Sequence, residues 1–151
     1  MKRTVLLIIT ALFLLVAPAT TAKANYVTET LKTREDDIEL LAKLIMAEAG
    51  SDYVTDRCRY LTGAVVINRV DDPDFPDTVA DVIYDNGQYA TARYLDKVHP
   101  NMTCWCIAMY LILYGCEDTP PDLVYQANFK QGSEVWETDK QPQYTMYFCL
   151  K

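Results

Sequence analysis

Residues 38–49 read Ile38-Glu39-Leu40-Leu41-Ala42-Lys43-Leu44-Ile45-Met46-Ala47-Glu48-Ala49. Leu41, Leu44 and Ile45 recur at the three- and four-residue spacing that places side chains on one face of an amphipathic helix. Glu48 continues this spacing, and at about 100° per residue it falls between Leu41 and Leu44 on the helical wheel. We therefore predict a helix that carries a carboxyl group on its apolar face.

The predicted position of Glu48 has a chemical consequence. A partly desolvated glutamate has a raised pKa, because burial disfavours its charged form. A carboxyl group that stays protonated near neutral pH can act as a general acid. Most glutamates near the end of a helix are instead solvated surface residues, so the rest of the sequence has to decide between the two interpretations.

The first 24 residues have the features of a secretory signal peptide. Lys2 and Arg3 precede an apolar run from Val5 to Ala17, and Ala22-Lys23-Ala24 provides a small-residue cleavage site. The apolar run has 13 residues, whereas a membrane span needs about 20. We therefore expect a secreted chain with no stable membrane span after cleavage. An uncleaved N-terminal anchor is the alternative.

The mature chain, residues 25–151, is acidic. Removal of Lys2, Arg3 and Lys23, and of no acidic residue, changes the formal charge from -7 to -10. This charge argues against a nucleic-acid partner and against a general attraction to anionic polymers. A polyanionic substrate would have to be held by local contacts.

The cysteines do not indicate a metal site. Their number, five, is odd, so at least one thiol stays free or pairs between chains. Buried free thiols are at least as consistent with the sequence as disulfides. Cys104 and Cys106 would point to different faces of a helix, and the one histidine is His99, so we expect no metal. No organic cofactor is indicated.

The remaining pattern predicts a leader over 25–36 and one domain over 37–151. Helices are expected over about 34–49, 57–70, 78–84 and 102–114, the first of them capped by an imperfect capping box at Thr33. The second helix should be the most buried. Short strands are expected over 123–127, 134–138 and 144–149. The fold class is α+β, mainly helical with a small C-terminal β-rich lobe.

Six short segments carry a resemblance to a known family. In order and spacing, the chain over about 37–149 resembles the cell-wall hydrolase family of the spore-cortex-lytic enzyme SleB and its relative CwlJ. The segments are residues 40–50, 63–70, 74–78, 82–84, 87–89 and 124–129. The resemblance implies a lysozyme-like fold and an enzyme that cleaves peptidoglycan glycan strands, and the predicted signal peptide would make this enzyme secreted or cell-wall associated. Glu48 would be its catalytic acid, because it matches the glutamate of the family's Glu-Ala motif.

Five further residues are expected to bind the glycan. Gln88 and Tyr89 follow a predicted turn, and Gln126, Asn128 and Phe129 lie at the end of a predicted strand. Amide side chains suit hydrogen bonds to N-acetyl and hydroxyl groups, and aromatic rings pack on sugar rings. Asn68 and Arg69 are expected to be structural, closing the second helix and pairing with an acid.

The sequence does not determine which residue, if any, is the second catalytic group. Asp52 and Asp56 are the nearest carboxylates in the sequence for a glycosidase mechanism. Without one of them, the muramyl C6 hydroxyl would attack the anomeric carbon, which is the chemistry of a lytic transglycosylase.

The sequence also departs from the family pattern. The common Arg-Gly-Glu-Pro is replaced by Gly50-Ser51-Asp52-Tyr53, and the segment after Tyr89 also differs. The other interpretation is therefore a non-catalytic exported module that binds wall glycan or another protein.

Overall fold

The computed structural model describes residues 28–151. The predicted signal peptide, residues 1–24, lies outside the described residues. Contacts divide the chain into two compact units, and the second, Asp36–Lys151, contains every predicted site residue. Between residues 28 and 151, no helix combines the length and the apolar character that a membrane span requires.

The helix that carries Glu48 ends at Ala49, as predicted, but it starts earlier than expected. Residues 28–49 are all helical, so the predicted start near residue 34 is wrong. Thr33 does not cap a helix, because its hydroxyl donates to the carbonyl of Glu29 one turn earlier. Gly50 follows the last turn, where a Cβ atom would lie 2.2 Å from the Met46 carbonyl oxygen.

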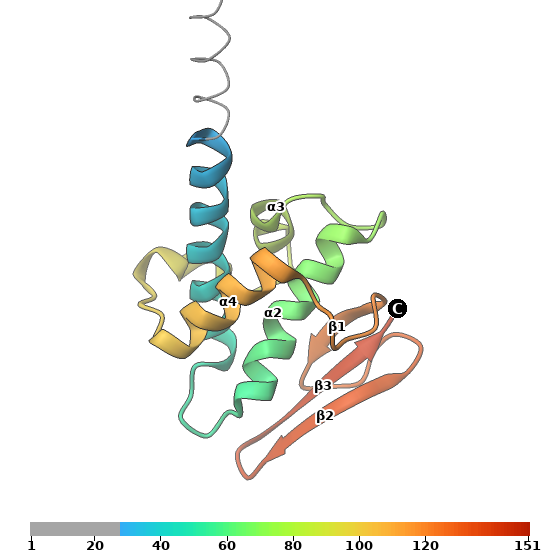
Figure 1. Ribbon diagram of the computed structural model, residues 1–151. Helices are drawn as coiled ribbons and strands as arrows, with labels where there is room; N and C mark the ends of the chain where they lie inside the picture. Colours follow the sequence, from blue (N-terminus) through green and yellow to red (C-terminus); the bar gives the residue numbers. More distant parts are fainter. Residues whose placement is uncertain (1–27) are drawn as a thin grey trace, which may run out of the picture. The chain divides into compact units, whose positions relative to one another are not determined.

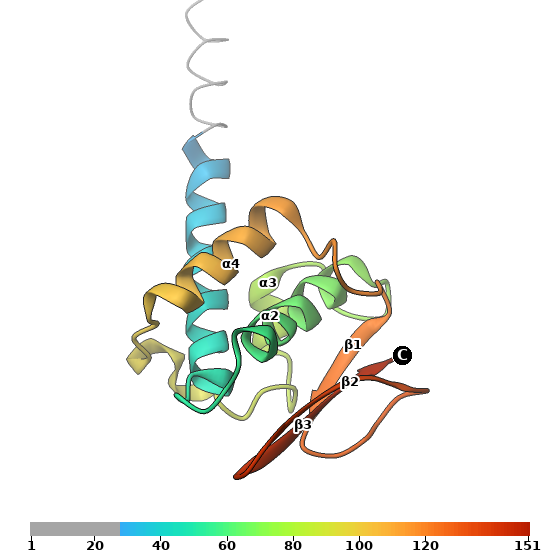
Figure 2. The same ribbon diagram turned by 60° about the horizontal axis from the view of Figure 1, so that its bottom comes forward.

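The helix α2, Asp56–Asp71, is the centre of the second unit (Figures 1 and 2). Thr55 caps it, since the threonine side chain accepts a hydrogen bond from the amide of Cys58. Buried residues occur on all of its sides, which confirms the prediction that this helix is the most enclosed. Ala64 of this helix packs in a core that the helices form together with Tyr89, and Leu61 packs in a second core against the sheet.

Three shorter helical elements complete the helical layer. The predicted helices 78–84 and 102–114 are confirmed as α3, Val79–Tyr84, and α4, Met102–Tyr114. Gly115 ends α4 with a φ of 79°, a left-handed value that favours glycine. A 3₁₀ helix, η1, Ala92–Lys97, was not predicted; Leu95 anchors it in the helical core.

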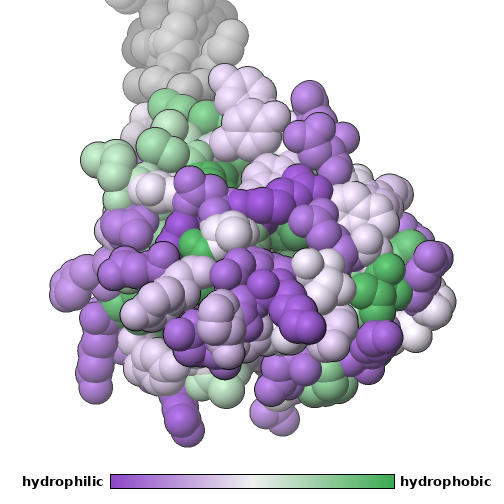
Figure 3. Space-filling view, turned by 90° about the horizontal axis from the view of Figure 1, so that it is seen from below, coloured by the Kyte–Doolittle hydropathy of each residue, from purple (hydrophilic) through white to green (hydrophobic). Residues whose placement is uncertain are grey.

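The C-terminal strands form one antiparallel sheet in the order β1-β3-β2. They are β1, Leu123–Ala127; β2, Val135–Gln141; and β3, Tyr144–Leu150. Phe148 of β3 is fully buried and packs with Leu61 and Val65 of α2. The α+β class with a C-terminal β lobe is therefore confirmed. Seen from below the view of Figure 1, the surface is mainly hydrophilic, with separate hydrophobic patches (Figure 3).

Candidate active site

Glu48 lies in the last turn of its helix, where a loop from another part of the chain meets it. The residue is half-buried, and its helical neighbours Leu44 and Ile45 are fully buried. One carboxylate oxygen, Oε1, accepts a hydrogen bond from the hydroxyl of Thr91. Thr91 precedes η1 but makes no side-chain cap there, so its hydroxyl is directed to Glu48. The carboxyl group is thus held on one oxygen, and the second oxygen remains for other contacts.

Tyr89 is the predicted binding residue that the structure places beside Glu48. Burial raises the pKa of Tyr89 to about 12; the Arg69 guanidinium opposes this shift, and the Glu48 carboxylate adds to it. The phenol oxygen accepts a long hydrogen bond of 3.5 Å from Nη1 of Arg69. Because that bond uses the oxygen as acceptor, Tyr89 keeps its own proton as a donor near the Glu48 carboxyl group.

Arg69 supports this arrangement from α2. Its Nε donates to the carbonyl oxygen of Val124 at 2.7 Å, which ties α2 to the first strand. Its guanidinium also lies 5.1 Å from the ring centre of Phe75 and 5.5 Å from that of Tyr89. Arg69 has a structural role, as predicted. The prediction that it pairs with an acid is wrong, because its contacts are to a carbonyl group, a phenol and aromatic faces. Asn68 beside it donates to the carbonyl of Leu123.

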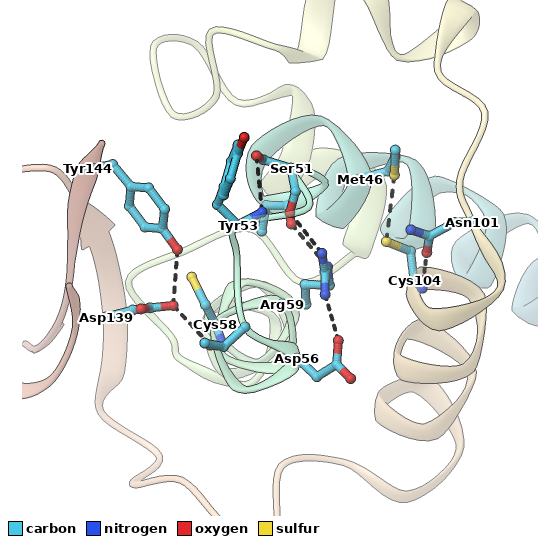
Figure 4. Close-up of polar contacts among 12 residues, drawn as sticks. Met46, Ser51, Tyr53, Asp56, Cys58, Arg59, Asn101, Cys104, Asp139 and Tyr144 are labelled. Carbon is cyan, nitrogen blue, oxygen red and sulfur yellow. Dashed lines mark hydrogen bonds and ion pairs between the residues drawn. The ribbon is translucent and has the colours of Figure 1, made fainter. Parts of the chain in front are cut away.

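A second arginine of α2 fixes the chain directly after Glu48 (Figure 4). Arg59 is buried, and its guanidinium donates to the carbonyl oxygens of Ala49 at 3.1 Å and Ser51 at 2.9 Å. Ala49 is the last helical residue, where carbonyl groups lack helical partners. Arg59 supplies such a partner and pairs with Asp56 at 2.6 Å. The end of the Glu48 helix is thereby anchored to the first turn of α2.

The same end of α2 is joined to the sheet through Asp139 (Figure 4). Its Oδ2 accepts hydrogen bonds from Thr55 at 2.9 Å and from Tyr144 at 3.2 Å. Burial opposes ionisation of Asp139, but hydrogen bonds from Gln141, Thr55 and other donors lower its pKa. Cys58 faces this carboxylate, and burial raises the pKa of its thiol to about 12, so the thiol stays protonated.

The other predicted binding residues are more dispersed. Gln88 is exposed, and its backbone amide closes the predicted turn by donating to the carbonyl of Asp85. Asn128 and Phe129 are exposed just beyond β1, Phe129 by 61%. Gln126 lies within β1, and its amide oxygen is buried without a hydrogen-bond partner. Within residues 28–151, no hydrogen bond links these four side chains to Glu48.

The candidate second carboxylates are both exposed. Asp52 lies in the turn after Gly50, and the side chain of Asp56 is 74% exposed while it pairs with Arg59. All five cysteines are free, with Cys104 buried and Cys106 exposed, as expected for positions two residues apart on a helix. Over the described part of the chain, no group of three His, Cys, Asp or Glu residues is arranged to hold a metal ion.

Two residues of the site were not identified from the sequence. Thr91 lies 43 positions from Glu48, and no periodic pattern connects a loop hydroxyl with a distant carboxylate. Arg59 carries a weak signal, because an arginine among the apolar residues of a buried helix needs partners inside the fold. The sequence does not show which carbonyl groups Arg59 binds.

Comparison with known proteins identifies the larger part of this domain. Residues 55–148 match the family model described as Cell Wall Hydrolase. The match includes Arg59, Arg69, Tyr89 and Thr91, and it begins seven residues after Glu48. No curated protein and no solved structure matches the chain.

Proposed function

Because the chain belongs to the Cell Wall Hydrolase family, we propose that it cleaves the glycan strands of peptidoglycan, with Glu48 as general acid and base. The observation that carries this proposal is the hydrogen bond from Thr91 to the Glu48 carboxyl group, beside the neutral phenol of Tyr89. The family supports a peptidoglycan substrate, and the contacts of Glu48 support its role as the reacting group.

In the first step, Glu48 acts in its carboxylic acid form. It transfers its proton to the glycosidic oxygen as the bond between that oxygen and the muramyl C1 atom breaks. Positive charge develops on C1, and Glu48 is left as a carboxylate. Thr91 would stabilise this carboxylate by donating to one oxygen, and the other oxygen would exchange the proton with the sugar.

In the second step, the muramyl C6 hydroxyl attacks C1. Its proton passes to Glu48, which regenerates the acid and releases a 1,6-anhydro product. This lytic transglycosylase route needs one carboxyl group, and it is favoured because Asp56 pairs with Arg59 and Asp52 lies exposed in its turn. Attack by water in place of the C6 hydroxyl would make the enzyme a glycosidase.

The substrate would lie over Glu48 and the residues around the end of β1. Tyr89 was expected to bind the sugar, but its phenol is buried, so we assign it to the support of the Glu48 carboxyl group. Gln126, Asn128 and the exposed ring of Phe129 would bind a neighbouring sugar, and Gln88 would contact an N-acetyl group. Export through the signal peptide, followed by action in the cell wall, completes the proposal.

The proposed catalysis is tested with purified peptidoglycan and the variant Glu48→Gln. We expect the variant to clear walls at least about 100-fold more slowly, because it keeps the shape of the side chain but cannot transfer a proton. Glu39→Gln on the same helix is the matched control; Glu39 pairs with Lys43 at the surface, and its variant should be fully active. Equal clearing by wild type and Glu48→Gln would refute the assignment.

The products separate the two reaction types. Mass spectrometry should find muramyl ends that lack one water molecule if the enzyme is a transglycosylase, and complete reducing ends if it is a glycosidase. If the wild type sediments with walls but never clears them, the chain is a binding module and the catalytic proposal is wrong.

A further inference from the structure

The outer face of α4 carries a line of exposed apolar side chains. Met102 is 75% exposed, Met109 47% and Leu113 44%, and Cys106 is the exposed cysteine among five. We name these four residues the α4 stripe. The opposite side of the helix is fully buried in the helical core through Cys104, Ala108 and Leu111. This helix is therefore apolar on its outer face as well as on its inner one.

The spacing of the α4 stripe is that of a helix seam. Its members follow one another at intervals of four, three and four residues. This is the alternation with which one helix packs along another in coiled coils and helix bundles. Tyr110 and Tyr114 are also exposed on this helix, with ring centres 5.4 Å apart. Methionine and tyrosine are enriched in protein interfaces.

We propose that the α4 stripe binds the α4 stripe of a second copy of this chain. Residues 102–114 contain no charged side chain, although the chain has a formal charge of -7. In a two-fold interface the same patch of both copies meets, so acidic side chains within that patch would repel one another, and an uncharged patch avoids this repulsion. The α4 stripe is such a patch.

The exposed area fits a weak dimer. With about 200 Å² of surface for each large side chain, the exposed fractions of Met102, Met109 and Leu113 in the α4 stripe, together with the adjacent Tyr110, amount to roughly 400 Å² per copy. Two copies would bury about 800 Å², which is less than a stable specific interface needs and fits a transient contact. We therefore expect a reversible dimer that dissociates on dilution.

Two other partners fit this surface less well. Helices that lie on membranes carry Lys or Arg on the face next to the lipid headgroups, and α4 has no basic residue. Glu117 and Asp118 follow it after two residues, and their negative charges would repel anionic lipid. Glycan sites use amide groups together with aromatic rings, whereas the α4 stripe consists of Met, Cys and Leu, and residues 102–114 contain no amide side chain.

The proposal is tested by sedimentation of the full chain over a range of concentrations. Met109→Lys places a charge in the α4 stripe, and in a symmetric dimer it places two, so we expect dimerisation at least about tenfold weaker. Tyr84→Lys adds the same charge at a side chain of α3 that is 56% exposed, and it should dimerise like the wild type. Circular dichroism verifies that both variants are folded, which is expected because both sites are exposed.

Alkylation of Cys106 by iodoacetamide, followed by mass spectrometry, locates the interface. Its rate should fall as the wild type dimerises and should stay constant in Met109→Lys. A monomeric wild type would overturn the proposal. So would a dimer that Met109→Lys leaves intact, or in which Cys106 reacts at an unchanged rate. Binding of the wild type to neutral phosphatidylcholine vesicles without any dimer would assign the surface to lipid instead.

Discussion

The hydroxyl of Thr91 donates a hydrogen bond to the carboxyl group of Glu48, across 43 positions of sequence. Thr91 stands at the start of η1, and Glu48 stands in the last turn of the first helix. Both η1 and the first helix are themselves held in place by other parts of the fold. Leu95 anchors η1 in the helical core, and Arg59 anchors the end of the Glu48 helix. Substitutions on each side of this contact therefore test the site.

Removal of the Thr91 hydroxyl should reduce activity without unfolding the protein. We expect Thr91→Val to lower the rate of wall clearing about tenfold or more, because a hydrogen bond to a charged group contributes about 1.5 to 3 kcal/mol. Thr91→Ser keeps the donor and should retain most of the activity. A Thr91→Val enzyme as fast as the wild type, with the same melting temperature, would show that the contact does not assist catalysis.

Loss of Arg59 should affect both stability and activity. In Arg59→Met, the carbonyl groups of Ala49 and Ser51 lose their buried donor, and we expect a loss of about 2 to 4 kcal/mol in the free energy of unfolding. Activity should fall even well below the melting temperature, since the Glu48 helix loses its anchor. The control is Arg57→Met, whose partly exposed pair with Glu137 contributes about 0 to 1 kcal/mol. Urea unfolding and clearing assays measure the two effects.

The buried phenol of Tyr89 should make the fold sensitive to alkali. Its pKa in the folded protein is about 12, against about 10 in an unfolded chain. The unfolded state thus loses this proton first, and stability falls as the pH rises from about 10 to about 12. A difference of two pKa units corresponds to about 2 to 3 kcal/mol. Between about pH 10 and pH 12, the free energy of unfolding should therefore fall by about 2 to 3 kcal/mol less in Tyr89→Phe than in the wild type.

The alkaline effect is measured by urea unfolding at several pH values between about 9 and 12. Tyr84→Phe is the control, because Tyr84 is exposed and its substitution should leave the alkaline loss unchanged. Cys58 and Cys116 also have pKa values near 12 through burial, so some alkaline loss remains in every variant. An identical pH dependence in Tyr89→Phe and wild type would contradict the prediction.

The helical core should not tolerate a larger residue at Gly63. A Cβ atom there would lie 2.5 Å from Cδ1 of Leu111 and 2.9 Å from Cδ1 of Ile45, both fully buried side chains. We expect Gly63→Ala to lower the free energy of unfolding by about 1 to 3 kcal/mol. Leu111→Ala opens space at the same place, so the double variant should be more stable than the sum of the two losses predicts. Additive losses would show that the residues do not interact.

Much of the secondary structure was predictable because its signals are local. The second and fourth helices follow long apolar runs, and Gly115 ends the fourth with the positive φ that glycine favours. The C-terminal strands follow short apolar runs. The first helix start was predicted wrongly, since Thr33 resembles a cap but lies inside a longer helix. The 3₁₀ helix was missed, because six residues held by one buried leucine have no clear period.

The candidate site was likewise predictable only where its features depend on neighbouring residues in the sequence. The sequence alone determined that Glu48 lies on an apolar helical face and that Tyr89 follows a turn, since the spacing of neighbours and the turn residues establish both. Only the tertiary structure decided which groups meet. It brought Thr91 to the carboxyl group, Arg69 to the phenol and Arg59 to the helix end. Side-chain hydrogen bonds between distant segments depend on how the helices pack around α2, and packing leaves no period in a single sequence.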